Sequence, residues 1–438
     1  MKGIRSAIAY ALSLLVTNGL FRSFEIDGQS PHDGPRLIVA NHFNGLVDAI
    51  VLVRGLHGLP HFIAKSTLFK RLPLRLALRA LGVVPVYRQS DVSDRSGNTS
   101  SFEEVRAALA KGRTVLIFPE GTVTDEQRLQ RIRTGAARIA LGAAAEGVRG
   151  LLIVPMGITY EDKVASRSRV LVQVGEPIPV DDEVAALAHG AEISEDNHDL
   201  VRSTTDLIRE RLLAVSPDYG SLVRERSMMR AAGVYARSHS GAFDEPSVSA
   251  IRAVAQRLAD ATGGAGDRAI DAVGRYELAL SAVGLRDDQI NPPPRVSDLA
   301  RVVVTKTIVV IIILPFALFG LLVNLVPIVL TWLVGAAIRE PVTKGTARVL
   351  TALVMFPLAW TIQILAVDPD YTLLTLVLMI VSAVLLVVGF KQVLDLIEAT
   401  ITYTSVRTRR ALLDDLAALR EQADGAIEAA LAESGAAA

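Results

Sequence analysis

Short apolar segments, separated by polar or glycine-containing stretches, run through the chain from about residue 24 to residue 180. Six of them are rich in Val and Ile and have the length of buried strands: RLIVAN, HFIAK, GVVPVY, TVLIFP, GLLIVPMGITY and RVLVQVG. Helical spacing of apolar residues occurs in the segments 47–56, 72–80, 102–112 and 134–146. This alternation predicts an α/β fold, a largely buried sheet flanked by helices, with ligands bound at loops that follow strands.

Beyond residue 180 the pattern becomes helical and rich in Ala and Arg, with interruptions at SPDYG, HSGAFDEP, ATGGAGD and NPPP. No catalytic motif is found there. We place the end of the first domain, residues 24–215, within this stretch. Residues 216–300 are expected to form a helical region that packs on the first domain or covers its opening.

The first residues, MKGIRSAIAYALSLLVTNGLF, combine a positive start with an apolar run. A signal peptide is one interpretation, but no clear small-residue cleavage site closes the run. The run is also too short to span a bilayer comfortably. We therefore expect residues 1–23 to form a helix on the membrane surface, with Lys2 and Arg5 near anionic headgroups. A plain core helix is the alternative.

Residues 301–391 have the composition of transmembrane helices. The clearest spans, 349–367 and 371–390, are joined by the acidic turn Asp368-Pro369-Asp370, and basic residues flank their other ends. The positive-inside rule then places the turn outside and the basic flanks in the cytoplasm. The segment 302–338 must return to the side it left, as two short spans or as a re-entrant hairpin with residues 324–327 at its tip.

The remaining residues, 392–438, are rich in Ala, Leu, Glu and Arg, which suits a solvated cytoplasmic helix. Together these segments predict a multi-pass protein of the cell membrane, the inner or plasma membrane, with its α/β domain in the cytoplasm.

Composition and charge exclude several classes of site. Lys+Arg and Asp+Glu balance at 46 each, so no basic field favours a nucleic-acid partner. The absence of Cys excludes disulfides, thiolate zinc sites and cysteine nucleophiles. His57 and His61 have a spacing typical of helical metal ligands, but Gly58-Leu59-Pro60 breaks the helix between them. We expect no metal site.

A histidine and an aspartate follow the first predicted strand of the domain, in LIVANHFNGLVDAI, residues 37–50. An imidazole beside a carboxylate is the usual arrangement of a general base. His42 and Asp48 are six residues apart, so they cannot pair if both lie within one regular helix. They can pair if His42 ends the strand and Asp48 lies one turn into the next helix, with Asn44-Gly45 as the turn. Alone, such a pair is more often structural than catalytic.

Other predicted strands also end in polar groups. VLIFPEGT, residues 115–122, ends in a carboxylate, a glycine and a hydroxyl, and GVVPVYR, residues 82–88, ends in a guanidinium suited to phosphate. In LLIVPMGITY, residues 151–160, Pro155 indicates an edge or bulged strand. Gly157 indicates close approach by backbone or ligand.

Taken in order, these blocks resemble the four-block signature of the phospholipid/glycerol acyltransferase superfamily, which includes lysophosphatidate and glycerol-3-phosphate acyltransferases. The blocks are His-Asp, Gly-x-x-Pro-x-x-Arg, Phe-Pro-Glu-Gly-Thr and Val-Pro-x-Gly. The segments AKSTLFK, RIRTGAARIA and GEPI agree with the family as well. The resemblance covers roughly residues 5–215 and does not explain the C-terminal membrane segment.

The resemblance implies an O-acyltransferase that uses no cofactor and takes acyl-CoA or acyl-carrier protein as co-substrate. His42 would deprotonate the acceptor hydroxyl, and Asp48 would orient His42. Five residues would bind the glycerol phosphate of the acceptor: Arg88, Glu120, Gly121, Thr122 and Arg133. Four would shape the substrate pocket: Asn41, Lys65, Pro155 and Gly157.

Two positions depart from the common family pattern. Five residues, 43–47, separate His42 from Asp48, where the commoner spacing has four. Val123 stands where many members carry Arg directly after Glu-Gly-Thr, so Arg131 or Arg133 would have to replace that charge.

The leading hypothesis is a membrane-bound acyltransferase of phospholipid biosynthesis that acylates 1-acylglycerol-3-phosphate or glycerol-3-phosphate at the membrane. The alternatives are an enzyme that remodels another lysophospholipid and a non-enzymatic lipid-binding membrane protein. A transporter is disfavoured because the membrane segments are few and carry little besides Asn324 and Gln363 that is polar.

Overall fold

The protein is seen in a computed structural model. The model describes residues 2–31, 33–65, 84–86, 96–123, 128–161, 168–216, 219–240, 245–262, 264–287, 296–338, 341–408 and 413–436. Two compact units are distinguished. Unit 1 comprises residues 1–218 and 340–346, and unit 2 comprises residues 219–339 and 347–438.

Unit 1 is built on a mixed sheet with the order β1-β7-β6-β2-β5-β3-β4, and β8 pairs with β6. The strands are β1 (Ser23–Asp27), β2 (Arg36–Ala40), β3 (His61–Lys65), β4 (Val84–Val86), β5 (Thr114–Ile117), β6 (Leu152–Tyr160), β7 (Arg169–Val174) and β8 (Ile178–Pro179). Each of the six predicted segments contains an observed strand, so these predictions are confirmed. β1 and β8 were not predicted.

The register of the central strands brings three sequence blocks to one edge of the sheet. β2 is parallel to β5 and to β6, and Val39 lies opposite both Ile117 and Pro155. Because parallel strands end at the same edge, the residues after Ala40, after Ile117 and at the end of β6 meet there.

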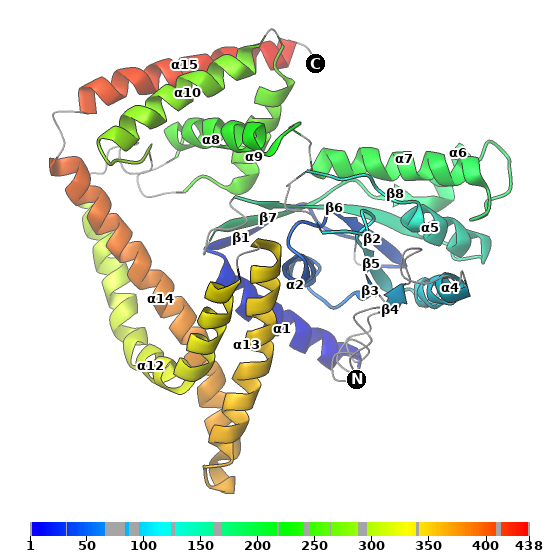
Figure 1. Cartoon of the computed structure of the whole chain (residues 1–438), viewed down its shortest axis with the longest axis horizontal. Helices are drawn as coiled ribbons and strands as arrows, with labels where there is room; N and C mark the ends of the chain where they lie inside the picture. The colour runs from blue at the N-terminus through cyan, green and yellow to red at the C-terminus, as the bar shows by residue number, and fades with distance from the viewer. Residues whose placement is uncertain are drawn as a thin grey trace. The chain divides into compact units, whose positions relative to one another are not determined.

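Helices flank the sheet (Figure 1). They are α1 (Lys2–Leu20), α2 (Leu46–Gly55), α4 (Ser96–Ala110), α5 (Gly135–Ala145), α6 (Ala185–Leu187) and α7 (His198–Val215), with a π-helical turn η2 (Val180–Val184). Leu37 and Val39 of β2 belong to a core shared with α4, α5 and α7. Alternation along the strand directs the buried Ile38 and Ala40 to the opposite face. The predicted helix at 72–80 lies outside the described residues.

Pro155 is not in an edge strand, which rules out the first of the two alternatives expected from sequence, an edge strand or a bulged one. β6 pairs with β2 along one side, and on its other side the partner changes from β8 at Ile153 to β7 at Met156. A proline has no N–H to donate, and it is tolerated here because it occupies the position where one partner ends and the next begins. The carbonyl of Pro155 accepts a hydrogen bond from the N–H of Gly175 at 2.8 Å.

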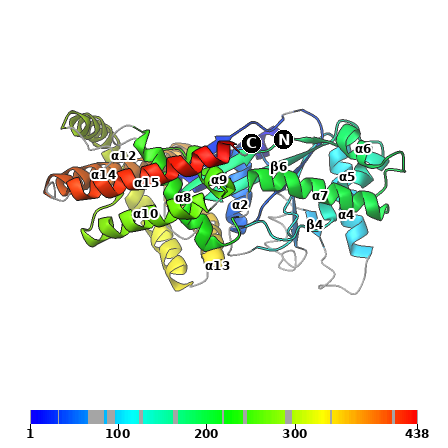
Figure 2. The same cartoon turned by 90° about the horizontal axis from the view of Figure 1, so that it is seen from above.

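Unit 2 contains a helical bundle formed by two distant parts of the sequence. Its helices are α8 (Leu222–Ser238), α9 (Val248–Asp260), α10 (Ala265–Ala282) and α15 (Leu413–Ala436), and they share one hydrophobic core. α15 lies beside α10 in both views (Figure 1 and Figure 2). The expectation of a solvated tail is therefore wrong for α15, because Ala423, Ile427 and Ala430 are fully buried.

Between the two parts of the bundle come the apolar helices α12 (Val296–Ala337), α13 (Pro341–Ile364) and α14 (Thr372–Thr408), with a short turn η3 (Pro369–Tyr371). Within the described residues these three helices are long and apolar enough to cross a membrane. α12 is one continuous helix with Pro315 and Pro327 inside it, and Figure 1 shows that it is bent. α14 extends past residue 391, the predicted end of the membrane segment, to Thr408.

Candidate active site

His42 and Asp48 lie on either side of the turn that joins β2 to α2. β2 ends at Ala40, α2 begins at Leu46, and Asp48 is in the first turn of α2. The Nδ1 atom of His42 lies 2.9 Å from Oδ2 of Asp48, which confirms the predicted pairing. Gly45 has φ 57° and ψ −125°, a backbone conformation open mainly to glycine. Through this residue the turn accommodates five residues between His42 and Asp48.

The carboxylate of Asp48 is fully buried and accepts three hydrogen bonds. Oδ2 accepts from the N–H of Asn44 at 2.7 Å as well as from the His42 ring, and Oδ1 accepts from the hydroxyl of Tyr160 at 2.6 Å. An acceptor at Nδ1 fixes the tautomer in which Nδ1 carries the proton and Nε2 has a free lone pair. The His42 side chain is 16% exposed. The arrangement thus leaves Nε2 as the ring atom that can accept a proton.

The carboxylate of Glu120 binds two backbone N–H groups of this site. Its Oε1 accepts from the N–H of His42 at 2.9 Å, and its Oε2 accepts from the N–H of Gln130 at 3.1 Å. The side chain is 2% exposed, and burial raises the pKa of the Glu120 carboxyl to about 7 against the opposing effect of these two hydrogen bonds. Both carboxylate oxygens are engaged by the backbone, so the geometry favours a positioning role over acceptor binding.

Phe118, the first residue of the Phe-Pro-Glu-Gly-Thr block, contacts the catalytic candidate directly. Its ring stacks on the His42 imidazole with a centroid distance of 3.8 Å and an interplanar angle of 8°. Stacking confines the imidazole to one plane beside its hydrogen bond to Asp48. In the sequence, Phe118 is only the first residue of that block, and no feature of the sequence predicts its contact with His42.

Gly121 and Arg133 lie together on the same side of the site. Gly121 has φ 65°, and a Cβ there would come 3.1 Å from Nε of Arg133. The N–H of Arg133 donates to the carbonyl of Pro119 at 2.8 Å, which ties the two segments together. The side chains of Arg133 and Thr122 are exposed. The guanidinium of Arg133 therefore lies beside Gly121, next to the residue that carries the Thr122 hydroxyl.

Asn41 and Gly157 are covered by other parts of unit 1. Asn41 is fully buried, its Oδ1 accepts from the N–H of Ile158, and its Nδ2 donates to the Ile158 carbonyl and the Ser216 hydroxyl. A Cβ at Gly157 would lie 1.9 Å from the carbonyl oxygen of Val215, so helix α7 occupies the space beside it. These buried positions join β2, β6 and α7.

The side chains of two predicted site residues lie outside the described part of the structure. Arg88 lies outside the described residues. Lys65 is the last residue of β3, but its side chain also lies outside the described part of the chain.

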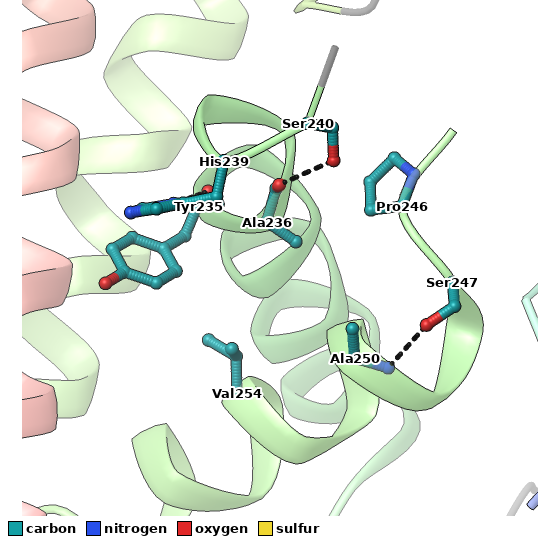
Figure 3. A pocket seen from close by; sticks show the side chains of 8 residues that line it. All are labelled: Tyr235, Ala236, His239, Ser240, Pro246, Ser247, Ala250 and Val254. Carbon is teal, nitrogen blue, oxygen red and sulfur yellow. Dashed lines mark hydrogen bonds between the residues drawn. The ribbon is translucent and has the colours of Figure 1, made fainter. Parts of the chain in front are cut away.

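A hollow of about 310 Å³ occurs in the bundle of unit 2, between α8 and α9 (Figure 3). Its polar groups are used locally. The Ser240 hydroxyl donates to the carbonyl of Ala236, the Ser247 hydroxyl accepts from the N–H of Ala250, and the ring of His239 packs against that of Tyr235. Among the described residues that line it, no set of polar groups converges on a ligand position, so the hollow is better explained by the packing of α8 against α9.

Comparison with known proteins decides what kind of domain this is. The sequence model of the acyltransferase family, described as Acyltransferase, matches residues 23–159. Residues 23–159 form an acyltransferase domain of the phospholipid/glycerol acyltransferase superfamily. The match includes β1, β2, β5 and all but the last residue of β6, and therefore the whole turn that carries His42 and Asp48.

Curated relatives of the acyltransferase domain are found in fungi and plants. Glycerol-3-phosphate O-acyltransferase 2 of Saccharomyces cerevisiae is 33% identical over 135 residues, 30% of this chain and 18% of the yeast protein. A chloroplastic 1-acyl-sn-glycerol-3-phosphate acyltransferase of Arabidopsis thaliana is 29% identical over 151 residues, 33% of this chain and 40% of the plant protein. The chain thus spans less than half of the length of either relative.

Among solved structures, the 1-acyl-sn-glycerophosphate acyltransferase PlsC from Thermotoga maritima is 18% identical. The comparison covers 47% of this chain and 80% of that chain, with a TM-score of 0.33. This score is too low to establish a shared fold, so the assignment of the acyltransferase domain depends on the sequence match.

Proposed function

We propose that the protein is a membrane-bound enzyme that moves a fatty acyl group from acyl-CoA or acyl-carrier protein to a hydroxyl of a glycerol phosphate acceptor. The acceptor would be 1-acylglycerol-3-phosphate or glycerol-3-phosphate, and the product would serve phospholipid synthesis. The observation that carries the proposal is the buried pair of Asp48 with His42 Nδ1, which leaves Nε2 as the basic atom within an acyltransferase domain. The names of the relatives support the class of acceptor.

In the proposed reaction, Nε2 of His42 takes the proton of the acceptor hydroxyl while the oxygen attacks the thioester carbonyl. A new ester C–O bond forms, the C–S bond breaks, and the leaving thiolate receives the proton from His42. Asp48 stabilises the imidazolium that exists between these two transfers. General base catalysis of this kind is worth about 10²–10⁴ in rate. No covalent enzyme intermediate and no cofactor enter the scheme.

The acceptor phosphate would be bound by guanidinium groups, which match its geometry with two parallel hydrogen bonds. Arg133 is exposed beside Gly121, so it is placed to replace the arginine that this chain lacks at Val123. Thr122 would add a hydroxyl. Arg88 has the same proposed role on the basis of the family resemblance, and Lys65 is proposed to line the substrate pocket.

We propose that the enzyme works at the cytoplasmic face of the cell membrane. Helix α1 exposes the apolar side chains of Ile4, Ile8 and Leu12 at a helical spacing, with exposures of 67%, 55% and 45%. Arg5 is exposed within the same stretch. An exposed apolar stripe beside a cation is typical of a helix that lies in the lipid headgroup region. The apolar helices of unit 2 would provide the permanent anchor.

The deciding experiment is an acceptor panel. The purified protein in detergent or lipid vesicles would receive labelled acyl-CoA together with glycerol-3-phosphate, 1-acylglycerol-3-phosphate, a lysophospholipid with another headgroup, or a monoacylglycerol without phosphate. Transfer to one of the first two supports the proposal. Transfer only to the other lysophospholipid would identify a remodelling enzyme, and no transfer to any acceptor would favour a lipid-binding protein.

Replacing the proposed base tests the mechanism in the same assay. His42→Ala should lower kcat by at least about 10², because general base catalysis contributes about 10²–10⁴ in rate. His189→Ala is the matched control, since His189 is exposed at a loop of the same unit and should leave activity unchanged. A His42→Ala protein that keeps full activity would exclude His42 as the base.

A second pair of variants tests the phosphate site. Arg133→Ala should raise KM for phosphate-bearing acceptors and leave KM for the monoacylglycerol unchanged. Arg149→Ala, which removes an exposed cation elsewhere in the same unit, controls for general charge. Equal loss with acceptors that lack phosphate would contradict the role of Arg133.

A further inference from the structure

Tyr160 contacts the proposed catalytic pair although it lies one residue beyond the part of the chain that matches the acyltransferase family. It is the last residue of β6, is 2% exposed, and donates its hydroxyl to Oδ1 of Asp48 at 2.6 Å. Its ring stacks against Phe21 with a centroid distance of 5.7 Å. The phenol is thus held by the sheet and by a second aromatic ring.

We infer that Tyr160 is a positioning residue that sets the orientation and the effective charge of Asp48 for the proposed base His42. This inference rests on the proposed function. One carboxylate oxygen of Asp48 serves His42 and the N–H of Asn44, and the other serves Tyr160. With donors on both oxygens, the carboxylate cannot rotate away from the imidazole.

The hydroxyl of Tyr160 also withdraws charge from the carboxylate. Burial, and then the nearby Asp48, raises the pKa of Tyr160 well above its ordinary value, so the phenol stays a neutral donor over the working pH range. A donor on Oδ1 partly neutralises the charge that stabilises the imidazolium. Tyr160 should therefore limit how strongly Asp48 stabilises the protonated form of His42 during the reaction.

The other groups that face His42 come from separate elements. Asp48 lies on α2, Glu120 follows β5 and accepts from the His42 backbone, and the uncharged ring of Phe118 covers the imidazole. Arg133 lies beyond Gly121 on the same side. None of these groups is altered when Tyr160 loses its hydroxyl, so the variant isolates the effect on Asp48.

The test is Tyr160→Phe in the full-length protein, with kcat and KM measured from pH 5.5 to 9. We expect kcat to fall about tenfold with KM for acyl-CoA unchanged, and the acidic limb of the rate profile to move to higher pH. Tyr276→Phe is the matched control, because Tyr276 is also buried and donates to a carboxylate, Asp287, at 2.8 Å in the other unit. It should leave kcat and the pH profile unchanged.

A fluorinated tyrosine at position 160 provides a variant of nearly the same shape if Tyr160→Phe fails to fold. Its phenol is a stronger donor, so the acidic limb should move to lower pH. A wild-type kcat and pH profile in either folded variant would overturn the inference. His42→Ala separates the two claims, because an active His42→Ala protein refutes the base itself. If the His42→Ala protein is inactive but the Tyr160→Phe protein has the kcat and pH profile of the wild type, only the role of Tyr160 is refuted.

A different set of contacts, within unit 2, concerns the path of the chain through the membrane. α8, α9 and α10 precede the apolar helices and α15 follows them, yet all four share one core. Arg420 of α15 is 7% exposed, donates to the Val234 carbonyl and pairs with Asp287. A bundle with one core lies on one side of a membrane. The chain between residues 287 and 413 must therefore cross an even number of times, although three helices are long enough to cross.

Contacts along α12 show which helix does not cross. In its first half, Lys306 pairs with Asp395 at 3.0 Å, and Gly320 packs against Ser382. This half is antiparallel to α14.

In its second half, Asn324 accepts from Nε1 of Trp360 at 2.7 Å, and Gly335 packs against Arg348. This half is antiparallel to α13. A short turn at residues 365–371 joins α13 to α14, so the far ends of these two helices, which carry Arg348 and Asp395, lie on the same side of the membrane. Lys306 and Gly335 contact these two residues, so the two ends of α12 lie on that side as well.

We infer that α12 is a re-entrant helix that enters the bilayer, bends near Asn324 and returns, and that the chain crosses only at α13 and α14. The bend has a local cause. Pro327 cannot donate to the carbonyl of Val323, and Nε2 of Gln363 supplies the missing hydrogen bond at 2.8 Å. The two polar residues that the sequence places in the membrane segment, Asn324 and Gln363, thus both serve this bend.

The chain has no cysteine, so single cysteines report topology directly. In sealed vesicles, Ser297→Cys and Ala336→Cys should react with an impermeant maleimide from the same side, and Tyr371→Cys from the opposite side. Labelling after detergent lysis confirms that each thiol is reactive. Labelling of positions 297 and 336 from opposite sides would overturn the inference.

Discussion

Two buried carboxylates surround His42, and each meets different donors. Asp48 accepts from an imidazole, a phenol and one backbone N–H, whereas Glu120, among the described residues, accepts from two backbone N–H groups. Burial raises the pKa of Glu120 to about 7, so near neutral pH its carboxyl exists in both protonation states. The family block that contains Glu120 therefore has a structural task in this protein, namely to fix where β2 ends relative to β5.

Glu120 should make the stability of unit 1 depend on pH. Its folded pKa of about 7 lies above the ordinary value of 4.5, so folding favours the protonated form. This contribution is complete below about pH 4.5 and is lost as the pH rises through 7, a change of about 3 kcal/mol. The melting temperature of wild type relative to Glu120→Gln should therefore fall between pH 5 and pH 8. A constant difference across this range would contradict the raised pKa.

At the scale of elements, the site depends on how β6 contacts α7. Gly157 lets the end of α7 approach β6, and Ser216 at that end accepts from Asn41, the residue before His42. A helix from the end of the domain thus supports the end of β2, just before His42, the proposed base. The sequence indicated a close approach at Gly157, and the structure shows that backbone makes it.

Gly157→Ala should destabilise unit 1 by about 1–3 kcal/mol, because its Cβ would overlap the carbonyl oxygen of Val215 and α7 must move. Gly274→Ala is the matched control. Gly274 lies inside α10, a Cβ there meets no atom within 4 Å, and the change should stabilise the helix by about 0.5–1 kcal/mol. Thermal unfolding of both variants measures the two effects. An unshifted melting temperature for Gly157→Ala would show that α7 yields without cost.

At the scale of the whole molecule, the long apolar helices of unit 2 lie in sequence between two parts of one bundle. Arg420 joins the parts through a network with Asp287, Asp424, Tyr276 and the carbonyl of Val234. Breaking a buried ion pair leaves an unpaired charge, which is much more costly than losing an exposed pair. The bundle should therefore depend strongly on this one residue of α15.

Arg420→Ala should lower the stability of the bundle by about 3–5 kcal/mol. Arg268→Ala is the control, since Arg268 of α10 also pairs with α15, through Glu433, but both side chains are exposed, and its loss should cost less than about 1 kcal/mol. Limited proteolysis that releases α15 measures both. Equal protection of the two variants would show that the Arg420 network adds little.

The sequence by itself determined the strand pattern of the α/β domain and the presence of long apolar helices, and it indicated the turn through which His42 can pair with Asp48. These follow from local information: hydrophobic period, glycine in a turn, and a motif whose residues lie within a few positions of one another. It also identified the superfamily, because the order of the four blocks is itself a sequence property.

Only the tertiary structure decided the partners of these residues. Tyr160, Phe118 and Glu120 meet His42 and Asp48 because parallel strands from distant parts of the chain end at one edge of the sheet. Pro155 is tolerated inside the sheet because two short partners meet there, and α15 is buried because a core formed about 150 residues earlier accepts it. Burial and hydrogen-bond partners depend on residues far away in sequence, and no local pattern contains them.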